Sequence, residues 1–293
     1  MQLKIMASRH AAFYSPLIAS IAAGFLKEEG LDAEYSVLGP GQRSHSLIRD
    51  GAVHVMQSAV SSNWKPMEQG ESPLAAHFAQ INRRDGFFLC SRTPDPSFEW
   101  TKLEGRTVIA DRGAQPMAML RYAARCKGVD WSHLHVVDAG TPEQMVAAFR
   151  AGHADYVHLQ GPAPQQLELE LAGYVVAPVG AAMPPVAFSS LCASREFISS
   201  DAARAFTRAF GRTKEWVQET PPEEVSARLA SFFPSVTREA LAAAVDAYQR
   251  IGCWEGGVEI PRDLYEQALN VFEAAGGIAR RHAYDDVCVA PPA

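Results

Sequence analysis

The sequence predicts an α/β protein of two lobes, each a mainly parallel sheet flanked by helices, with a hinge cleft between the lobes. The main observation is a repeat: RDGAVHVMQSA, residues 49–59, returns in outline as RAGHADYVHLQGP, residues 150–162. Each copy closes a stretch in which strand and helix patterns alternate as βαβαβ, the order typical of parallel sheets with helical crossovers. A chain of 293 residues is also long enough to bury a core in each of two such units.

The first βαβαβ unit occupies the N-terminal part of the chain. Pro16 fits the first turn of a helix, where its missing N–H costs nothing, and we expect this helix to run through AAGFLKEEG and to end at Gly30. A turn at residues 39–42 precedes a second helix, which Gly51 ends. The three predicted strands are LKIM (3–6), DAEYSV (32–37) and VHVMQ (53–57).

The second unit follows the same order, with GVD at residues 128–130 where the first unit has GLD at residues 30–32. The loop GAQP, residues 113–116, leads into the helix MAMLRYAARCKG. Thr141 is the expected N-cap of the next helix, TPEQMVAAFRAG. The three predicted strands are RTVIAD (106–111), LHVVDAG (134–140) and ADYVHL (154–159).

Two segments are expected to carry the chain between the lobes. GFFLC, residues 86–90, has the pattern of a buried strand at the first crossing, and residues 173–197 supply a further strand and the return. The predicted lobes are residues 1–86 with 188–293, and residues 87–187. From Ser200 onward we expect four amphipathic helices that pack on the first lobe, followed by a tail at residues 285–293.

Composition and charge limit the partners and cofactors that the chain can have. The formal net charge is −6 and the pI is about 5.9, so no basic surface predicts a nucleic-acid partner. The five cysteines are odd in number, widely spaced and without a CxxC pair, which favours free buried thiols, no metal site and no cofactor. The apolar runs are all far shorter than a membrane span.

Several segments together resemble one known family. A proline-initiated helix, GFLKEEGLDAEY at residues 24–35, a turn, a helix and DGAVHV at residues 50–55 are similar to the NMT1/THI5-like (SsuA/THI5-like) type II periplasmic solute-binding proteins. Residues 105–124 and 137–156 extend the resemblance over most of the chain. It implies a type II periplasmic-binding-protein fold that clamps a small polar or anionic ligand, such as a sulfonate, a pyrimidine or an aromatic acid. It also implies an ABC transporter permease as partner.

A cytoplasmic enzyme on the same scaffold, or a ligand sensor, is the alternative. The pyrimidine synthases of the family use a cysteine-rich iron motif that this chain lacks, and Gln57, Ser58 and Ala59 stand where they use lysine and histidine. For a desulfinase or decarboxylase, Cys90 with His10 or His158 is the nucleophile and base that the sequence offers. The apolar strand around Cys90 is expected to raise its pKa and to lower its reactivity, which favours a binding protein.

The N-terminal segment bears on where the protein is found. A signal peptide needs a basic start, a continuous apolar run and a small-residue cleavage site, and this segment does not have all three in sequence. We therefore interpret it as part of the mature fold. If a leader is missing from this chain, we expect a periplasmic protein. If the sequence is the full gene product, we expect a cytoplasmic one.

Ligands of open α/β sheets bind beyond the carboxyl ends of the strands, so we expect the site there. In the first lobe His10 follows the first strand, and the helix start at Tyr14 and Ser15 offers N–H groups to an anion. Arg83, near the first crossing, offers a bidentate guanidinium. The first-lobe candidates are His10, Tyr14, Ser15, Gly39, Gln57, Ser58, Ala59, Asn82 and Arg83.

The second lobe supplies the matching candidates. By the resemblance, residues 113–116 take the place where such binding proteins hold oxyanions on backbone N–H groups, although Pro116 removes one donor. Gln160 ends its strand where Ser58 ends the strand of the first copy, so the two strand ends are expected to face one ligand. His158 lies inside the strand and is interpreted as a core or wall histidine. The second-lobe candidates are Gly113, Ala114, Gln115, Gln160 and Gly161.

Overall fold

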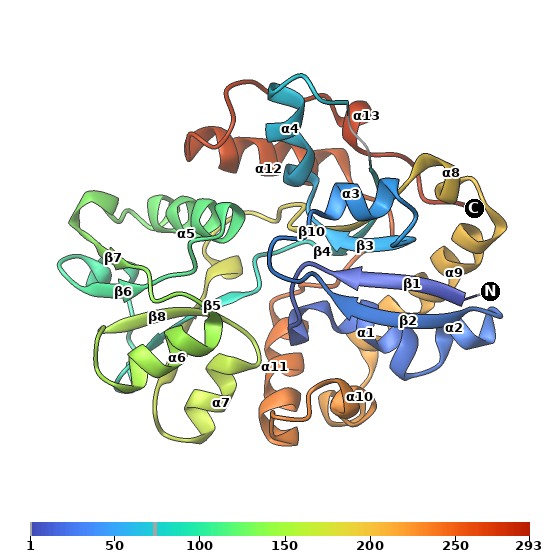
Figure 1. Cartoon of the computed structure of the whole chain (residues 1–293). Coiled ribbons are helices and arrows are strands. Elements are labelled where there is room, and N and C mark those ends of the chain that lie inside the picture. Colours follow the sequence, from blue (N-terminus) through green and yellow to red (C-terminus); the bar gives the residue numbers. More distant parts are fainter. Residues whose placement is uncertain (1, 73–74) are drawn as a thin grey trace.

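The computed structural model describes residues 2–72 and 75–293 and contains two mixed five-stranded sheets (Figure 1). The first sheet has the order β2-β1-β3-β10-β4, and the second has the order β7-β6-β8-β5-β9. The strands of the first sheet are β1 (Gln2–Ala7), β2 (Asp32–Val37), β3 (Val55–Ser58), β4 (Ala76–Asn82) and β10 (Ser189–Ala193). Those of the second are β5 (Phe87–Ser91), β6 (Thr107–Ile109), β7 (His135–Val137), β8 (Tyr156–Gln160) and β9 (Tyr174–Pro178).

The two sheets have the same topology, as the repeat in the sequence predicts. β1 pairs in parallel with β2 and β3, and β6 pairs in parallel with β7 and β8. The next strand in each sheet is antiparallel: β10 beside β3, and β5 beside β8. The chain passes from the first sheet to the second between β4 and β5 and returns between β9 and β10. The predicted two-lobed α/β fold is therefore confirmed, while the residue boundaries of the lobes stay a prediction.

Helices cover both sheets. Those that follow the strands of the two repeats are α1 (Ser15–Ala22), α2 (Phe25–Glu28), α3 (Ser44–Arg49), α4 (Trp64–Glu68), α5 (Ala114–Cys126), α6 (Pro142–Arg150) and α7 (Ala163–Leu169). The later helices are α8 (Arg195–Ile198), α9 (Asp201–Glu219), α10 (Pro222–Leu229), α11 (Arg238–Arg250), α12 (Arg262–Ala274) and α13 (Tyr284–Val287). Short 3₁₀ turns are η1 (Ala12–Tyr14), η2 (Val60–Asn63), η3 (Trp100–Leu103), η4 (Trp131–His133), η5 (Val179–Ala181) and η6 (Ala230–Phe232).

The local signals for helix starts and stops are mostly confirmed. Thr141 caps α6 with a full capping box, in which its side chain accepts from the Gln144 N–H and the Gln144 side chain accepts from the Thr141 N–H. The prediction of one unbroken helix that ends at Gly30 is wrong, because the structure has two helices there. Gly24 adopts a left-handed φ of +90°, which ends α1 at Ala22 and lets α2 start at Phe25.

The predicted loop at residues 113–116 is also corrected. α5 begins at Ala114, so Ala114, Gln115 and Pro116 form its first turn, with Gly113 as the N-cap. A proline is tolerated in a first turn because the N–H groups there have no intrahelical acceptor. This turn points its two free N–H groups, from Ala114 and Gln115, away from the helix.

The C-terminal third joins both sheets rather than the first lobe alone. α9 and α10 pack on α1 as predicted, but α11 also contacts α7 and α12 contacts α5. The predicted tail is wrong, because Val287 and Cys288 are buried and Cys288 forms a β-bridge with His77. The Val289 N–H donates to the His77 carbonyl at 2.9 Å. β4 is the edge strand of its sheet, and the segment after α13 satisfies part of that open edge.

All five cysteines are free; Cys126 is exposed and the other four are buried, close to the sequence prediction. Within the described residues, no helix is both long enough and apolar enough to cross a bilayer.

Candidate ligand-binding site

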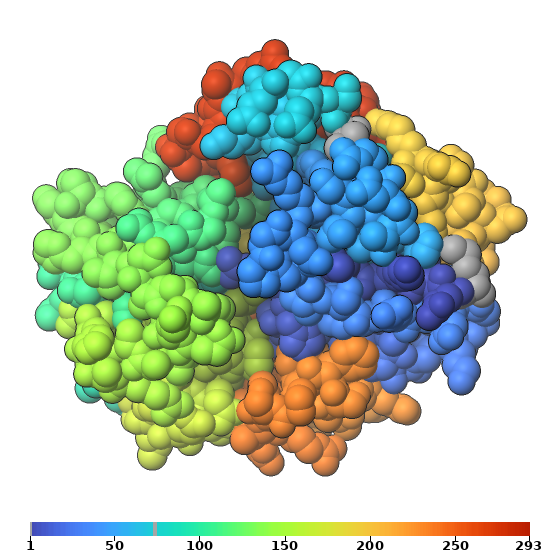
Figure 2. Space-filling model, viewed as in Figure 1, coloured from blue at the N-terminus to red at the C-terminus, as the bar shows by residue number. Residues whose placement is uncertain are grey.

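A cavity of about 270 Å³ lies between the two sheets. The furrow between the green second lobe and the blue first lobe is visible in Figure 2. Both repeats, the return crossing and the C-terminal segment contribute to its wall, and its volume suits a small molecule. The lining residues are Ser8, Arg9, Tyr14, Gln57, Ser58, Ala59, Ser61, Ser62, Trp64, Lys65, Phe87, Ala114, Gln115, Pro116, Gln160, Phe188, Ser189, Phe272, Gly277 and Ile278.

Two strand ends of the repeats meet in this cavity. Gln57 near the end of β3 and Gln160 at the end of β8 both line it. The Gln57 Oε1 accepts hydrogen bonds from the Ser8 N–H at 3.0 Å and from the Ser8 hydroxyl at 2.8 Å, which fixes that amide. By contrast, the Gln160 Nε2 is buried and makes no hydrogen bond of ordinary geometry among the described residues, although the Gln160 side chain lies beside the Tyr14 hydroxyl. It is a donor available to a ligand.

Gln115, in the first turn of α5, connects the second lobe to the first. Its side-chain oxygen accepts from the Ser61 hydroxyl at 2.7 Å, and its Nε2 donates to the Phe188 carbonyl of the return crossing. The backbone N–H groups of Ala114 and Gln115 lack intrahelical acceptors, and the helix dipole makes this end electropositive. Tyr14 adds a hydroxyl on the opposite lobe, and burial raises its pKa to about 12, so the phenol stays protonated at neutral pH.

The charges at the cavity are unequal. The Arg9 guanidinium binds Asp111 through two contacts, of which Nη2 to Oδ1 measures 3.0 Å. Burial works to raise the pKa of Asp111, but the hydrogen bond and charge of Arg9 outweigh it and hold that pKa below its ordinary value. Arg9 is thereby neutralised. Lys65, exposed at the mouth, makes no ion pair or side-chain hydrogen bond within residues 2–72 and 75–293.

No lining residue is an aspartate or a glutamate. The cavity therefore combines one uncompensated positive charge with hydroxyl, amide and backbone donors. Such a site attracts an anion and disfavours a cation. Among the described residues, no group of three or more histidine, cysteine, aspartate or glutamate side chains is placed to hold a metal ion.

Seven of the predicted ligand-binding residues line this cavity: Tyr14, Gln57, Ser58, Ala59, Ala114, Gln115 and Gln160. Their role in binding stays a prediction. The structure thus brings together the strand ends of β3 and β8 and the start of α5, as the sequence repeat suggested.

Three predicted first-lobe residues, His10, Ser15 and Gly39, lie outside the lining, and their polar groups are used elsewhere. The His10 ring contacts the Tyr35 hydroxyl at 3.0 Å and the Phe232 carbonyl at 2.7 Å, and burial lowers its pKa. The Ser15 hydroxyl donates to the Ala12 carbonyl. The Gly39 N–H donates to Gln42 and closes a turn.

Of the remaining predicted residues outside the lining, Asn82 and Arg83 lie at the first crossing, and Gly113 and Gly161 are held by hydrogen bonds of their N–H groups. Asn82 donates to the Phe13 carbonyl at 2.7 Å, and Arg83 lies 3.9 Å from the Glu255 carboxylate. The Gly113 N–H donates to Asp111 at 2.8 Å. The Gly161 N–H donates to the Tyr248 hydroxyl at 2.8 Å, and a Cβ at this glycine would lie 2.7 Å from that oxygen.

Cys90 and its two candidate bases, His10 and His158, all lie outside the cavity lining. Cys90 is fully buried in β5, paired with Val157 and Val175, and burial raises its pKa well above the ordinary value. His10 stacks on Phe233. His158 stacks on Phe87, and burial lowers its pKa to about 3, so it is a neutral core histidine as interpreted from the sequence.

Sequence reasoning missed most of the residues that close the cavity. Arg9 was detectable, because it is the second residue after β1 and Asp111 is the second residue after β6, so aligning the repeats would have paired them. Lys65 follows a serine-rich turn after β3, and this position near a strand end is a weak indication of a cavity residue. The sequence gives no indication that Phe272, Gly277 and Ile278 line the cavity, since only the tertiary fold brings them here.

Comparison with known proteins agrees with this architecture. The chain is 22 % identical over 291 residues to YtlA of Bacillus subtilis (strain 168), described as a candidate binding protein; the match covers 98 % of this chain and 87 % of that protein. The ligand-binding component of an ABC-type import system from Staphylococcus aureus, solved with zinc bound, superposes with a TM-score of 0.75 at 14 % identity, covering 99 % and 97 % of the two chains.

The alkanesulfonate-binding protein SsuA from Xanthomonas axonopodis pv. citri, bound to MOPS, superposes with a TM-score of 0.72 at 11 % identity, covering 99 % of this chain and 98 % of that one. At these identities the solved structures establish the fold. The family model described as "NMT1/THI5 like" matches residues 12–224, which is most of the chain. The protein belongs to the NMT1/THI5-like family.

Proposed function

We propose that the protein is a solute-binding protein that holds a small monoanionic ligand in the cavity between its two sheets. One observation carries this proposal: the wall comes from both sheets and contains the unpaired Lys65 ammonium but no carboxylate. Arg9 adds no net charge, because Asp111 neutralises it. A single negative charge on the ligand therefore matches the site.

The donors around the cavity support an oxyanion rather than a halide-like ion. Gln160 Nε2 and the first-turn N–H groups of α5 come from the second lobe, and the Ser62 hydroxyl, buried without a partner among the described residues, comes from the first. An oxyanion with several oxygens can accept from more than one of them, and each hydrogen bond to a charged group is worth about 1.5–3 kcal/mol. Sulfonates and carboxylates are the ligand classes with this chemistry.

We further propose that the protein delivers its solute to the permease of an ABC-type importer. The support is the fold shared with the import component from Staphylococcus aureus and with the sulfonate-binding SsuA protein. Two chain crossings between the sheets allow the lobes to rotate about them, so a ligand held by both lobes would favour the closed arrangement.

The test compares an anion with a neutral molecule of the same shape. Purified protein is titrated with benzenesulfonate, benzoate and the uncharged benzenesulfonamide, and binding is read by isothermal titration calorimetry and native mass spectrometry. We expect a 1:1 adduct with an intact anion and at least tenfold weaker binding of the sulfonamide. Binding that ignores charge, or no binding of either anion, contradicts the proposal. Chemical conversion of the ligand would instead establish an enzyme.

A further inference from the structure

We infer that one side of the cavity is an apolar subsite beside Lys65, closed by the C-terminal segment at residues 276–283, and that the solute is a monoanion carrying an aromatic ring or branched chain. This inference rests on the proposed function and specifies its ligand class. The subsite is formed by Trp64, Phe272, Gly277 and Ile278. Trp64 directly precedes Lys65, the lysine of the lining.

The floor of the subsite consists of aromatic rings. Trp64 is fully buried, so it supports this floor from behind, and it packs edge-on against Phe272, with ring centroids 5.0 Å apart at 87°. The indole Nε1 already donates to the Tyr265 hydroxyl at 3.0 Å, so it offers no free donor. The side chains of these four residues offer no free polar group to a charged ligand, whereas an apolar group would bury its surface against them without that cost.

The end of α12 turns the chain over this floor. The Gly277 N–H donates to the Phe272 carbonyl at 2.8 Å and the Gly276 N–H donates to the Glu273 carbonyl, which is a Schellman motif. Gly276 has the left-handed φ of +68° that the motif requires. A Cβ at Gly277 would lie 2.9 Å from the Phe272 ring, so only glycine lets the chain pass this close.

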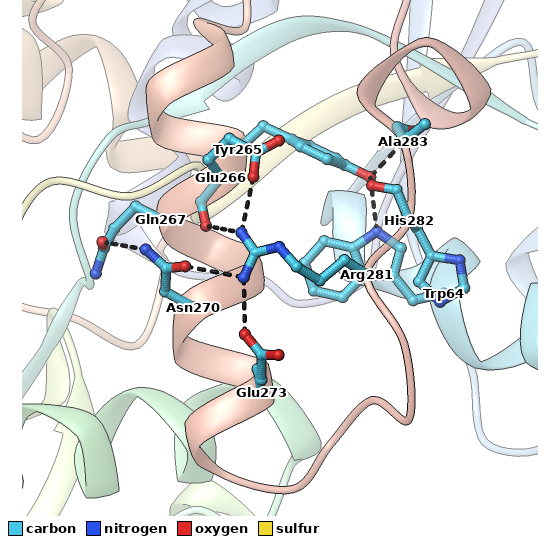
Figure 3. Close-up of polar contacts among 9 residues, drawn as sticks. All are labelled: Trp64, Tyr265, Glu266, Gln267, Asn270, Glu273, Arg281, His282 and Ala283. Carbon is cyan, nitrogen blue, oxygen red and sulfur yellow. Dashed lines mark hydrogen bonds and ion pairs between the residues drawn. The ribbon is translucent and has the colours of Figure 1, made fainter.

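Charged side chains then hold the segment in place, as Figure 3 shows for Arg281. Arg281 binds Glu266 at 2.7 Å and Glu273 at 2.8 Å, both on α12, and donates to Asn270 at 3.0 Å. From the other side, Glu68 of α4 accepts the Ala279 N–H at 2.6 Å. The segment is therefore fixed to α12 and to α4, the helix that carries Lys65.

A third contact links the segment to the floor itself. The Tyr265 hydroxyl that accepts from Trp64 donates in turn to the His282 carbonyl at 3.1 Å (Figure 3). The wall and the floor are thus one hydrogen-bonded unit, formed before any ligand arrives. A preformed apolar surface lowers the ordering cost of binding.

The experiment measures a size series of sulfonates in three proteins. Methanesulfonate and benzenesulfonate are titrated by calorimetry into the wild type, Ile278→Trp, which fills the subsite, and Ile278→Ala, which enlarges it. Burial of a phenyl ring predicts that the wild type binds benzenesulfonate at least about tenfold more tightly than methanesulfonate. Ile278→Trp should remove this preference while methanesulfonate affinity is retained. Ile278→Ala should weaken benzenesulfonate about three- to tenfold.

Leu169→Ala, at the exposed end of α7, is the matched control and should leave both affinities unchanged. Equal affinity for the two sulfonates in the wild type, or a preference that survives both Ile278 variants, overturns the subsite while the anion site stands. Failure of every anion to bind the wild type overturns the proposed function and the subsite with it. If Ile278→Trp does not fold, Ile278→Ala alone decides between these outcomes.

Discussion

Arg9 and Asp111 bind each other across the two sheets from equivalent positions of the repeat. Each is the second residue after a strand, β1 for Arg9 and β6 for Asp111, and those strands hold the same place in their sheets. The pair joins the lobes at the edge of the cavity and cancels the charge of Arg9. It therefore decides how much positive charge a ligand meets.

Asp111→Asn should convert the site from one that prefers monoanions to one that accepts dianions. The asparagine oxygen can still accept from the Gly113 N–H, but Arg9 becomes a second uncompensated cation. We expect affinity for 1,3-benzenedisulfonate to rise about tenfold at low salt and the gain to shrink as salt is added, because Arg9 is partly exposed. Calorimetry at two salt concentrations measures both effects.

The control for this change is Asp138→Asn. Asp138 also accepts an N–H two residues ahead, from Gly140, but is an exposed loop residue outside the cavity. An equal gain in the control would show that net charge alone, rather than the release of Arg9, sets the affinity.

Lys65→Gln should weaken anion binding without affecting the fold. The ammonium has no ion pair among the described residues, so the free energy of unfolding should change by no more than about 0.5 kcal/mol. Loss of one near-surface charge at the ligand should cost about 1–2 kcal/mol of binding, or roughly five- to thirtyfold in affinity. Lys27→Gln on α2 is the control, and matching losses in the two variants would exclude a local role for Lys65.

Tyr248→Phe should destabilise the protein. The hydroxyl accepts from the Gly161 N–H at 2.8 Å and donates to the Gly86 carbonyl at 2.9 Å, so one side chain of α11 ties β8 and β5 of the second sheet. The phenylalanine leaves two buried backbone groups unpaired, which costs about 1–3 kcal/mol. Urea unfolding compares it with Tyr122→Phe, whose hydroxyl has no hydrogen bond within the described chain; equal stabilities would contradict the assignment.

Asp85, at the first crossing, should make the protein less stable as pH rises. Its Oδ1 accepts from the Phe87 N–H at 2.6 Å, its Oδ2 is buried without a partner in the described residues, and burial raises its pKa to about 8. The folded state therefore keeps a proton that the unfolded chain has already released. The stability that this proton contributes is present below the ordinary aspartate range and declines between about pH 4 and pH 8.

Asp85→Asn removes this titration while an oxygen remains to accept from Phe87. The free energy of unfolding of the variant should exceed that of the wild type at pH 8. This advantage of the variant should grow by about 1–3 kcal/mol between pH 5 and pH 8. Urea unfolding from pH 5 to pH 9 gives the two profiles. Parallel profiles would mean that Asp85 is ionised in the folded protein throughout.

The repeated architecture could be predicted because its signals are local and occur twice. Gly51 and Gly152 both end a helix with a left-handed φ, and Gly30 and Gly128 do the same before an edge strand of each sheet. The alternation of apolar and polar residues then predicts where the strands lie in the sequence. The break at Gly24 escaped notice because a single glycine inside a helical pattern is often tolerated.

The cavity was predictable only where it is built from the repeat. Gln57 and Gln160 follow from strand ends that the sequence aligns, so both were expected at the site. Ile278 has no equivalent position in the repeat. Its place at the cavity depends on the Schellman turn at the end of α12 and on the packing of that helix against α5. Long-range packing of this kind leaves no periodic trace in the sequence.

The opposite charges at the two equivalent positions have a consequence for how the halves recognise each other. Two copies of the first half meeting through this surface would bring two guanidinium groups together, and two copies of the second half would bring two carboxylates together. Only the unlike pairing of Arg9 with Asp111 is attractive. The charges at these two positions thus favour contact between the two halves of one chain over contact between like halves of two molecules.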